Sequence, residues 1–134
     1  MRVAAFQRFA IFDDPARVSE TVLRDLRWAD RHGVDIAIFP ECYLQGHSYE
    51  RSLIERRAVS LDGPVVRELI DRASGISATV ILGLFERRDC MTCNSAVVIG
   101  NGRILGVPTR GGMLARHRIS RVDQGTLALR YQYL

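Results

Sequence analysis

Two glutamates stand where apolar segments of the sequence end, and a cysteine follows one of them. Glu41 and Cys42 come directly after the proline that closes "DIAIF", and Glu86 ends "VILGLFE". Functional groups in a parallel α/β sheet gather just past the carboxyl ends of the strands. The two carboxylates are therefore candidates for one pocket in which one of them acts as a general base. Exposure of both side chains to water is the competing interpretation.

The cysteines allow further chemistry, and each possibility has a competitor. Cys42 is a poor nucleophile for Glu41 to activate, because consecutive residues that leave a strand point apart. Cys90 and Cys93 have the C-x-x-C spacing, but a zinc site needs two more ligands, for which Cys42 and His47 are the candidates. A redox pair would stand at a helix start, whereas this pair precedes a strand-like segment. We interpret Cys90 and Cys93 as ordinary thiols in a loop and expect no metal.

The first forty residues predict a β-α-β unit. "RVAAFQ" (2–7) and "DIAIF" (35–39) are apolar runs typical of buried strands. Between them, Asp14 is suited to cap a helix, Pro15 to occupy its first turn and Gly33 to end it. Apolar residues at helical spacing form one face of this helix: Val18, Val22, Leu26 and Ala29. We expect the two strands to be parallel, with a right-handed crossover.

The middle of the chain repeats this order and then changes. Residues 49–61 and 63–74 predict two helical segments, and residues 78–86 predict another buried strand. Residues 94–107 predict two short strands joined by Asn101-Gly102, a dipeptide suited to a type I′ turn because both residues need positive φ. The expected fold class is α/β, with a mostly parallel sheet that ends in an antiparallel hairpin.

Length and composition indicate one domain. The chain has 134 residues, of which 47% are hydrophobic, enough for a single core. No stretch approaches the roughly 20 apolar residues of a membrane span, and the N-terminus turns acidic before it could form a signal-peptide core. An odd number of cysteines without an export signal argues for reduced thiols. We expect a cytoplasmic protein with no membrane contact.

The charge is uneven along the chain. Residues 1–102 hold 13 arginines and 14 acids, whereas residues 103–134 hold six arginines and one acid. All basic residues are arginine, and the sequence contains no lysine. The arginine-rich tail has aromatic residues only at Tyr131 and Tyr133 and lacks a recognition fold and a stacking platform. We expect no specific nucleic-acid partner.

Four segments in order, "VAAFQ", "DIAIFPE", "VILGLFER" and "NSAVVIGNGRILG", resemble the N-terminal half of the carbon–nitrogen hydrolase (nitrilase and aliphatic amidase) superfamily. The resemblance covers about residues 2–107. It implies half of an α-β-β-α sandwich and a Glu-Lys-Cys triad that works without metal or organic cofactor. In that chemistry a cysteine thiolate attacks an amide or nitrile carbon, a glutamate is the general base, and a lysine stabilises the developing charge.

The resemblance assigns roles to both glutamates and leaves two roles empty. By resemblance, Glu41 is the general base and Glu86 supports the pocket through hydrogen bonds. The family's lysine follows the hairpin, where this chain reads "VPTRGGML". Thr109, Arg110 and Gly111 then match the family's Tyr-Arg-Lys, and a one-residue slip puts Arg110 on the lysine. An arginine there would keep the charge but not the compact ammonium, and no cysteine follows Cys93.

These departures lead to an expected division of the chain and two functional hypotheses. Residues 1–107 are expected to be a partial hydrolase domain, and residues 108–134 a divergent tail produced by a frameshift after Val107 or a truncated gene model. The first hypothesis is a hydrolase of small amides, nitriles or carbamoyl compounds, inactive as written and homo-oligomeric in the intact family. The second is a noncatalytic half-domain that associates with a full-length partner, which would cover the open apolar face of the sheet.

Overall fold

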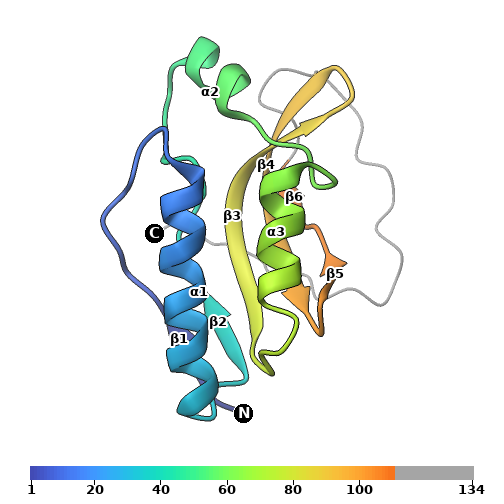
Figure 1. Ribbon diagram of the computed structural model, residues 1–134. Coiled ribbons are helices and arrows are strands. Elements are labelled where there is room, and N and C mark those ends of the chain that lie inside the picture. Colours follow the sequence, from blue (N-terminus) through green and yellow to red (C-terminus); the bar gives the residue numbers. More distant parts are fainter. Residues whose placement is uncertain (111–134) are drawn as a thin grey trace.

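The computed structural model describes residues 1–110, which form three helices and six strands (Figure 1). The strands are β1 (Val3–Ala5), β2 (Ile36–Ile38), β3 (Thr79–Arg88), β4 (Met91–Gly100), β5 (Arg103–Gly106) and β6 (Thr109–Arg110). The helices are α1 (Pro15–Arg31), α2 (Arg51–Arg57) and α3 (Pro64–Arg72). Gly111 and the rest of the predicted tail after Arg110 lie outside the described residues.

One mixed sheet contains all six strands, in the order β1-β2-β3-β4-β5, with β6 also paired to β4. β1, β2 and β3 are parallel neighbours. β3 with β4, β4 with β5, and β4 with β6 are antiparallel. The α/β class and the change from parallel to antiparallel pairing are confirmed.

Helix α1 forms as its sequence predicts. The Asp14 side chain accepts a hydrogen bond from the backbone N–H of Arg17 at 2.9 Å, and Pro15 is the first helical residue. Gly33, with φ of +63°, follows the last turn in the left-handed conformation that commonly ends a helix. The four residues predicted to form the apolar face are all buried, together with Leu23.

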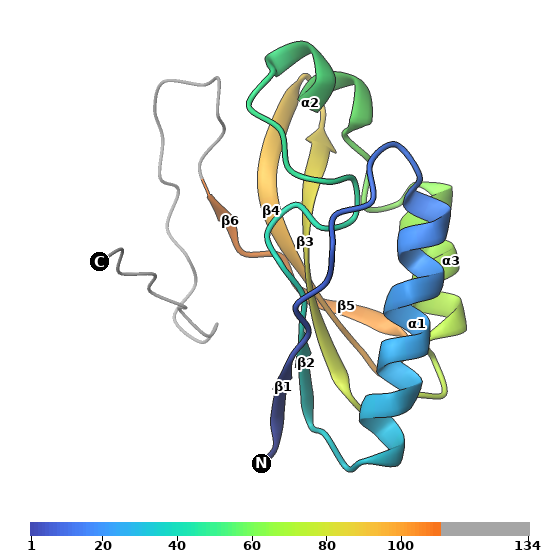
Figure 2. The ribbon, with the colours of Figure 1, turned by 90° about the vertical axis from the view of Figure 1, so that its left-hand side faces the viewer.

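Helices α1 and α3 cover the same face of the sheet (Figure 2). Their buried side chains pack against Val80, Leu82 and Leu84 of β3 and against Val97 and Ile99 of β4. Alternate residues of β4 are buried on this helix-covered face, while the intervening residues, 92, 94, 96 and 98, are only half-buried. Because side chains alternate along a strand, these half-buried residues lie on the opposite face, here called the open face.

The antiparallel part of the sheet begins earlier than the sequence suggested. β3 continues to Arg88, and Asp89 and Cys90 turn the chain into β4. Asp89 has a φ of +52°, unusual for a residue other than glycine. Cys93 is therefore a buried residue within β4, and the prediction of a loop at this residue was wrong. The β4–β5 turn is as predicted, since Asn101 and Gly102 have φ values of +53° and +66°.

Among residues 1–110, we find no helix with the length and apolar character needed to cross a membrane.

Candidate functional site

Glu41 lies on a turn that crosses the open face at Gly83 of β3. A Cβ atom at Gly83 would lie 2.5 Å from the carbonyl oxygen of Pro40 and 2.7 Å from the Cα atom of Glu41. Real Cβ atoms do not approach backbone atoms this closely, so only glycine allows the turn to lie against the strand. Sequence reasoning missed this role, although a glycine inside a strand is a known signal of close backbone approach.

The residues after Glu41 are fastened to β3 by backbone and side-chain hydrogen bonds. The N–H of Leu44 donates to the carbonyl of Gly83 at 3.2 Å. The buried Gln45 side chain donates to the carbonyl of Phe85 and accepts from its N–H, both at 3.0 Å. An amide side chain thus occupies the place of a neighbouring strand beside β3 once β2 has ended. The turn that carries Glu41 is held at a fixed position on the sheet.

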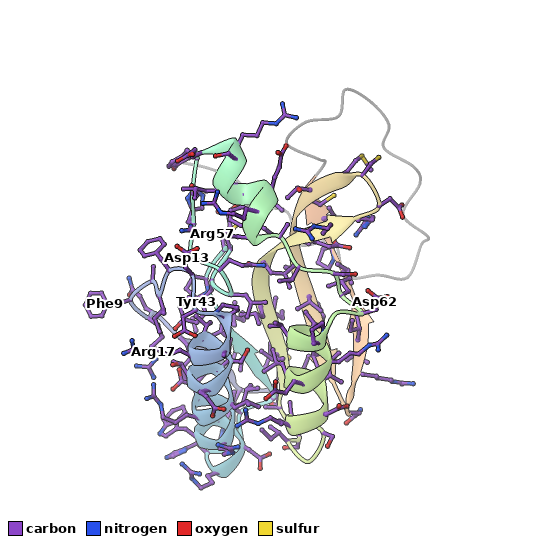
Figure 3. All side chains as sticks on the ribbon, turned by 45° about the horizontal axis from the view of Figure 1, so that its top comes forward. Phe9, Asp13, Arg17, Tyr43, Arg57 and Asp62 are labelled. Atoms are coloured by element: carbon purple, nitrogen blue, oxygen red, sulfur yellow. The ribbon has the colours of Figure 1, made fainter. Side chains whose placement is uncertain are left out.

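The segment before α1 covers the end of this turn. Gly46 has a φ of +79°, and an added Cβ would fall 2.6 Å from the Phe12 ring. The guanidinium of Arg57, at the end of α2, forms two hydrogen bonds with the Asp13 carboxylate and lies 5.9 Å from the centre of the Phe12 ring. Figure 3 shows Asp13 and Arg57 side by side. Three segments far apart in the sequence therefore meet around the turn.

The Glu41 side chain itself is exposed and has a neutral partner. Its Oε1 accepts a hydrogen bond from Nδ2 of Asn94, a half-buried residue of β4. Among residues 1–109, whose side chains the structure describes, no cationic group lies within 4.0 Å of the Glu41 carboxylate, and no hydrogen bond reaches its Oε2. Within this part of the chain, Asn94 holds Oε1, and Oε2 accepts no hydrogen bond.

Cys42 contacts the same asparagine but is unsuited to nucleophilic attack. Its Sγ lies 3.4 Å from Oδ1 of Asn94, so Glu41 and Cys42 do not simply point apart as predicted. The thiol is fully buried, and Cys42 has a φ of +51°. Burial, reinforced by the charge of Glu41, raises the pKa of Cys42 to about 12. Because the thiolate is the reactive form, the protonated Cys42 is excluded as a nucleophile near neutral pH.

Glu86 is buried in a network of charged and hydroxyl groups. Arg88 donates to its two carboxylate oxygens at 2.9 and 2.7 Å, and the Ser95 hydroxyl donates to Oε2 at 2.6 Å. The same guanidinium donates to the Thr109 hydroxyl of β6 at 3.1 Å. The hydrogen bond with Glu86 is the main reason that the pKa of Arg88 is raised. This network connects β3, β4 and β6.

The two glutamates do not share a pocket. Glu41 contacts Asn94 and Glu86 contacts Ser95, and these consecutive residues of β4 face opposite sides of the sheet. Glu86 lies on the helix-covered side and Glu41 on the open face. Any support from Glu86 for the Glu41 site therefore passes through the strands rather than through direct contact.

The segment predicted to carry the family's lysine lies beside the site. In β6, Thr109 is paired with Ser95, and Arg110 is paired with Asn94. With the one-residue slip, Arg110 matches the position of the family's lysine. In the backbone register, Arg110 is thus next to Asn94, which holds Glu41.

Other features of the described residues lie elsewhere. A hollow of about 420 Å³ opens between the first turns of α1 and α3, lined by residues that include Asp14, Arg17 and Val65, and it holds none of the site residues. Within residues 1–110, no group of three or more histidine, cysteine or acidic side chains is arranged to hold a metal ion.

The sheet topology and the position of Glu41 on its open face define the class of protein. The family model for carbon-nitrogen hydrolase matches residues 2–126. The chain therefore belongs to the carbon–nitrogen hydrolase family. The match continues beyond residue 107, and the predicted boundary at that residue stays a prediction.

Known relatives agree with this assignment. The glutamine-dependent NAD(+) synthetase of Mycobacterium leprae is 31% identical over 107 residues, which are 80% of this chain and 16% of that protein. The aliphatic nitrilase of Rhodococcus rhodochrous is 24% identical over 99 residues, 64% of this chain and 27% of the nitrilase. The chain spans about a sixth to a quarter of the length of these curated relatives.

Solved structures show the same fold. A CN-hydrolase superfamily protein from Xanthomonas campestris matches with a TM-score of 0.68 and 22% identity, over 81% of this chain and 40% of that one. A glutamine-dependent NAD+ synthetase from Acinetobacter baumannii matches with a TM-score of 0.65 and 19% identity, over 81% of this chain and 20% of that one.

Proposed function

We propose that Glu41 is the general base in the hydrolysis of a carbon–nitrogen bond. One observation carries the proposal: the Glu41 carboxylate is exposed, is held by a neutral amide, and has no cationic partner among residues 1–109. A carboxylate in this state keeps an oxygen with which to take a proton from a nucleophile or from water. Glu86 is proposed to support the site indirectly, by fixing β6 beside β4.

The proposed substrate is a small carboxamide. Glutamine-dependent NAD(+) synthetases recur among the curated relatives, and their name states a dependence on glutamine, which carries a primary amide. The aliphatic nitrilase match makes a nitrile the second substrate class. Glutamine is therefore the first compound to test.

The 134 residues alone are proposed to be inactive. Hydrolysis by this chemistry needs a thiolate and a cation at the substrate heteroatom. The sequence contains no lysine, and the cysteine nearest Glu41 has a pKa of about 12. An ammonia-release assay with glutamine and a panel of amides and nitriles is expected to show no turnover by this chain. Turnover that disappears in Glu41→Gln would contradict the proposed inactivity while supporting the base.

The base is best tested in an active context. Residues 1–107 would replace the matching segment of the glutamine-dependent NAD(+) synthetase of Mycobacterium leprae, and ammonia release from glutamine would be measured. In this chimera, Glu41→Gln is expected to lower kcat by roughly 10²- to 10⁴-fold. Glu55→Gln, which changes an exposed glutamate on α2, is the matched control and is expected to leave kcat unchanged. Equal activity of the two variants would exclude Glu41 as the base.

A noncatalytic half-domain is the second candidate. Half-buried aliphatic side chains on the open face, such as Ile38, Ile81 and Val98, favour it. Sedimentation of the chain with and without a full-length hydrolase of the family separates the two candidates, since only the second requires a mixed complex.

The proposed frameshift has its own test in the nucleotide sequence after codon 107, where another frame should encode a Tyr-Arg-Lys segment.

A further inference from the structure

Asn94 lies near Glu41 on a part of β4 that is paired with a strand on each side. In the backbone register it is paired with Phe85 of β3 on one side and with Arg110 of β6 on the other. Its neighbours in β4, Cys93 and Ser95, are buried on the helix-covered face. A side chain on a strand held from both sides is a fixed reference point, unlike a residue on a loop.

Both ends of the Asn94 amide are used. Nδ2 donates to Oε1 of Glu41, while Oδ1 lies 3.4 Å from Sγ of Cys42, which can donate its proton. Reversing the amide would place its oxygen against a carboxylate oxygen, an arrangement of two acceptors. The two contacts therefore determine how the amide lies, and the amide in turn determines where Glu41 lies.

The choice of a neutral donor has a chemical consequence. An arginine in the same place would also hold the carboxylate, as Arg88 holds Glu86, but its charge would stabilise the ionised form and make the group a weaker base. A neutral amide fixes one oxygen while stabilising the carboxylate less. Such a partner suits a group that must be both oriented and able to accept a proton.

We propose that Asn94 is the positioning residue of the site: its amide holds Oε1 of Glu41 so that Oε2 faces the reacting atoms. This inference rests on the proposed role of Glu41 as the base. Asn94 itself takes no part in proton transfer.

The contact can be tested in the full 134-residue chain without any activity, by NMR with ¹³C and ¹⁵N labelling. On lowering the pH, the Asn94 side-chain NH₂ resonances are expected to shift with the same midpoint as the carboxyl carbon of Glu41. In Glu41→Gln this shift is expected to be lost. The side-chain amide of Asn101, on the exposed β4–β5 turn, is the internal control and should not follow Glu41.

Variants of Asn94 test the positioning directly. In the original chain the vicinal couplings of Glu41 are expected to report one χ1 rotamer, and in Asn94→Ala they are expected to collapse to an average. Asn94→Asp keeps the shape and the acceptor for Cys42 but removes the donor, so it is expected to release Glu41 as well. Thr92→Ala, two residues earlier on the same face of β4, should leave the couplings unchanged.

Two results would overturn the proposal. One is an Asn94 NH₂ resonance that does not follow the carboxyl carbon of Glu41 as the pH is lowered, and the other is unchanged Glu41 couplings in both Asn94 variants. Should Asn94→Ala fail to fold, the Glu41 couplings in Asn94→Asp still decide the matter. These outcomes differ from failure of the proposed function, which shows as full activity of Glu41→Gln in the chimera while the Asn94 contact persists.

Discussion

Glu41 and Glu86 both follow apolar segments of the same sheet, and their carboxylates have opposite surroundings. Glu86 is buried and accepts hydrogen bonds from Arg88 and Ser95 on both of its oxygens. Glu41 is exposed, and the neutral amide of Asn94 holds one of its oxygens. A carboxylate whose two oxygens are both hydrogen-bonded, one partner being a cation, stabilises the fold. A carboxylate with one oxygen left without a hydrogen bond can still accept a proton. Under the proposed function, this difference distinguishes Glu86 as the supporting carboxylate from Glu41 as the base.

The turn under Glu41 gives the largest expected effect. Gly83→Ala places a Cβ against backbone atoms of Pro40 and Glu41 that cannot move independently, and we expect it to lower the free energy of unfolding by about 3 kcal/mol. Urea unfolding measures the loss. Gly75→Ala is the matched control, because the space around Gly75 is open, and its effect should stay below about 1 kcal/mol. Similar values for both variants would mean that the turn does not depend on Gly83.

The buried carboxylate should give the next largest loss of stability. Glu86→Gln keeps the shape but places an NH₂ group against Arg88, so we expect a cost of about 2 kcal/mol in the free energy of unfolding. Glu55→Gln removes an exposed ion pair with Arg51 on α2 and should cost less than about 0.5 kcal/mol. If Glu86→Gln were as harmless as this control, Glu86 would not be the structural member of the pair.

The charge of Glu41 can be detected through Cys42. We expect the Cβ resonance of Cys42 to titrate near pH 12, and Glu41→Gln should move the midpoint lower while burial keeps it above the ordinary 9.0. A thiol whose pKa rises on folding stabilises the folded state while it is protonated. This contribution is therefore complete below about pH 9 and is lost as the pH rises toward 12.

Cys42→Ala should abolish this part of the alkaline loss of stability. A midpoint for Cys42 that does not respond to Glu41→Gln would show that the Glu41 carboxylate does not lie close enough to the thiol to affect its pKa.

The smallest expected effect is that of Glu41→Gln on stability. The glutamine can still accept the hydrogen bond from Asn94, and the side chain is exposed, so the free energy of unfolding should change by less than about 0.5 kcal/mol. Thermal unfolding followed by circular dichroism is sufficient. A loss as large as that of Glu86→Gln would remove the distinction between the two carboxylates.

Much of the fold could be predicted because its signals are local. Asp14, Pro15 and Gly33 set the bounds of α1 within one segment of chain, and Asn101-Gly102 adopts the positive φ values that its turn requires. The β3–β4 hairpin escaped prediction because its turn is Asp89-Cys90, without a glycine. The predicted strand ended at Glu86, whereas β3 continues to Arg88, which pairs with the buried Glu86.

The candidate site was less predictable because its contacts are distant in sequence. The resemblance pointed to Glu41, but Asn94 lies 53 residues away, and only the register of the sheet brings the two together. The role of Gly83 likewise depends on a turn that crosses the strand more than 40 positions later in the chain. The same register places Glu86 and Glu41 on opposite faces of the sheet. The positions of the two residues at strand ends could not predict this separation.

The alternation along β4 makes this site intolerant of a change in the length of the strand. The Asn94 and Ser95 side chains lie on opposite faces of the sheet, where they contact Glu41 and Glu86, only because of their order on the strand. Deleting one residue between Met91 and Asn94 would exchange the faces of every following position and offer each glutamate the other's partner. A length change at the Asp89-Cys90 tip would leave that order intact. Natural variants of this protein should therefore vary in length at the hairpin tip and stay constant in length along β4.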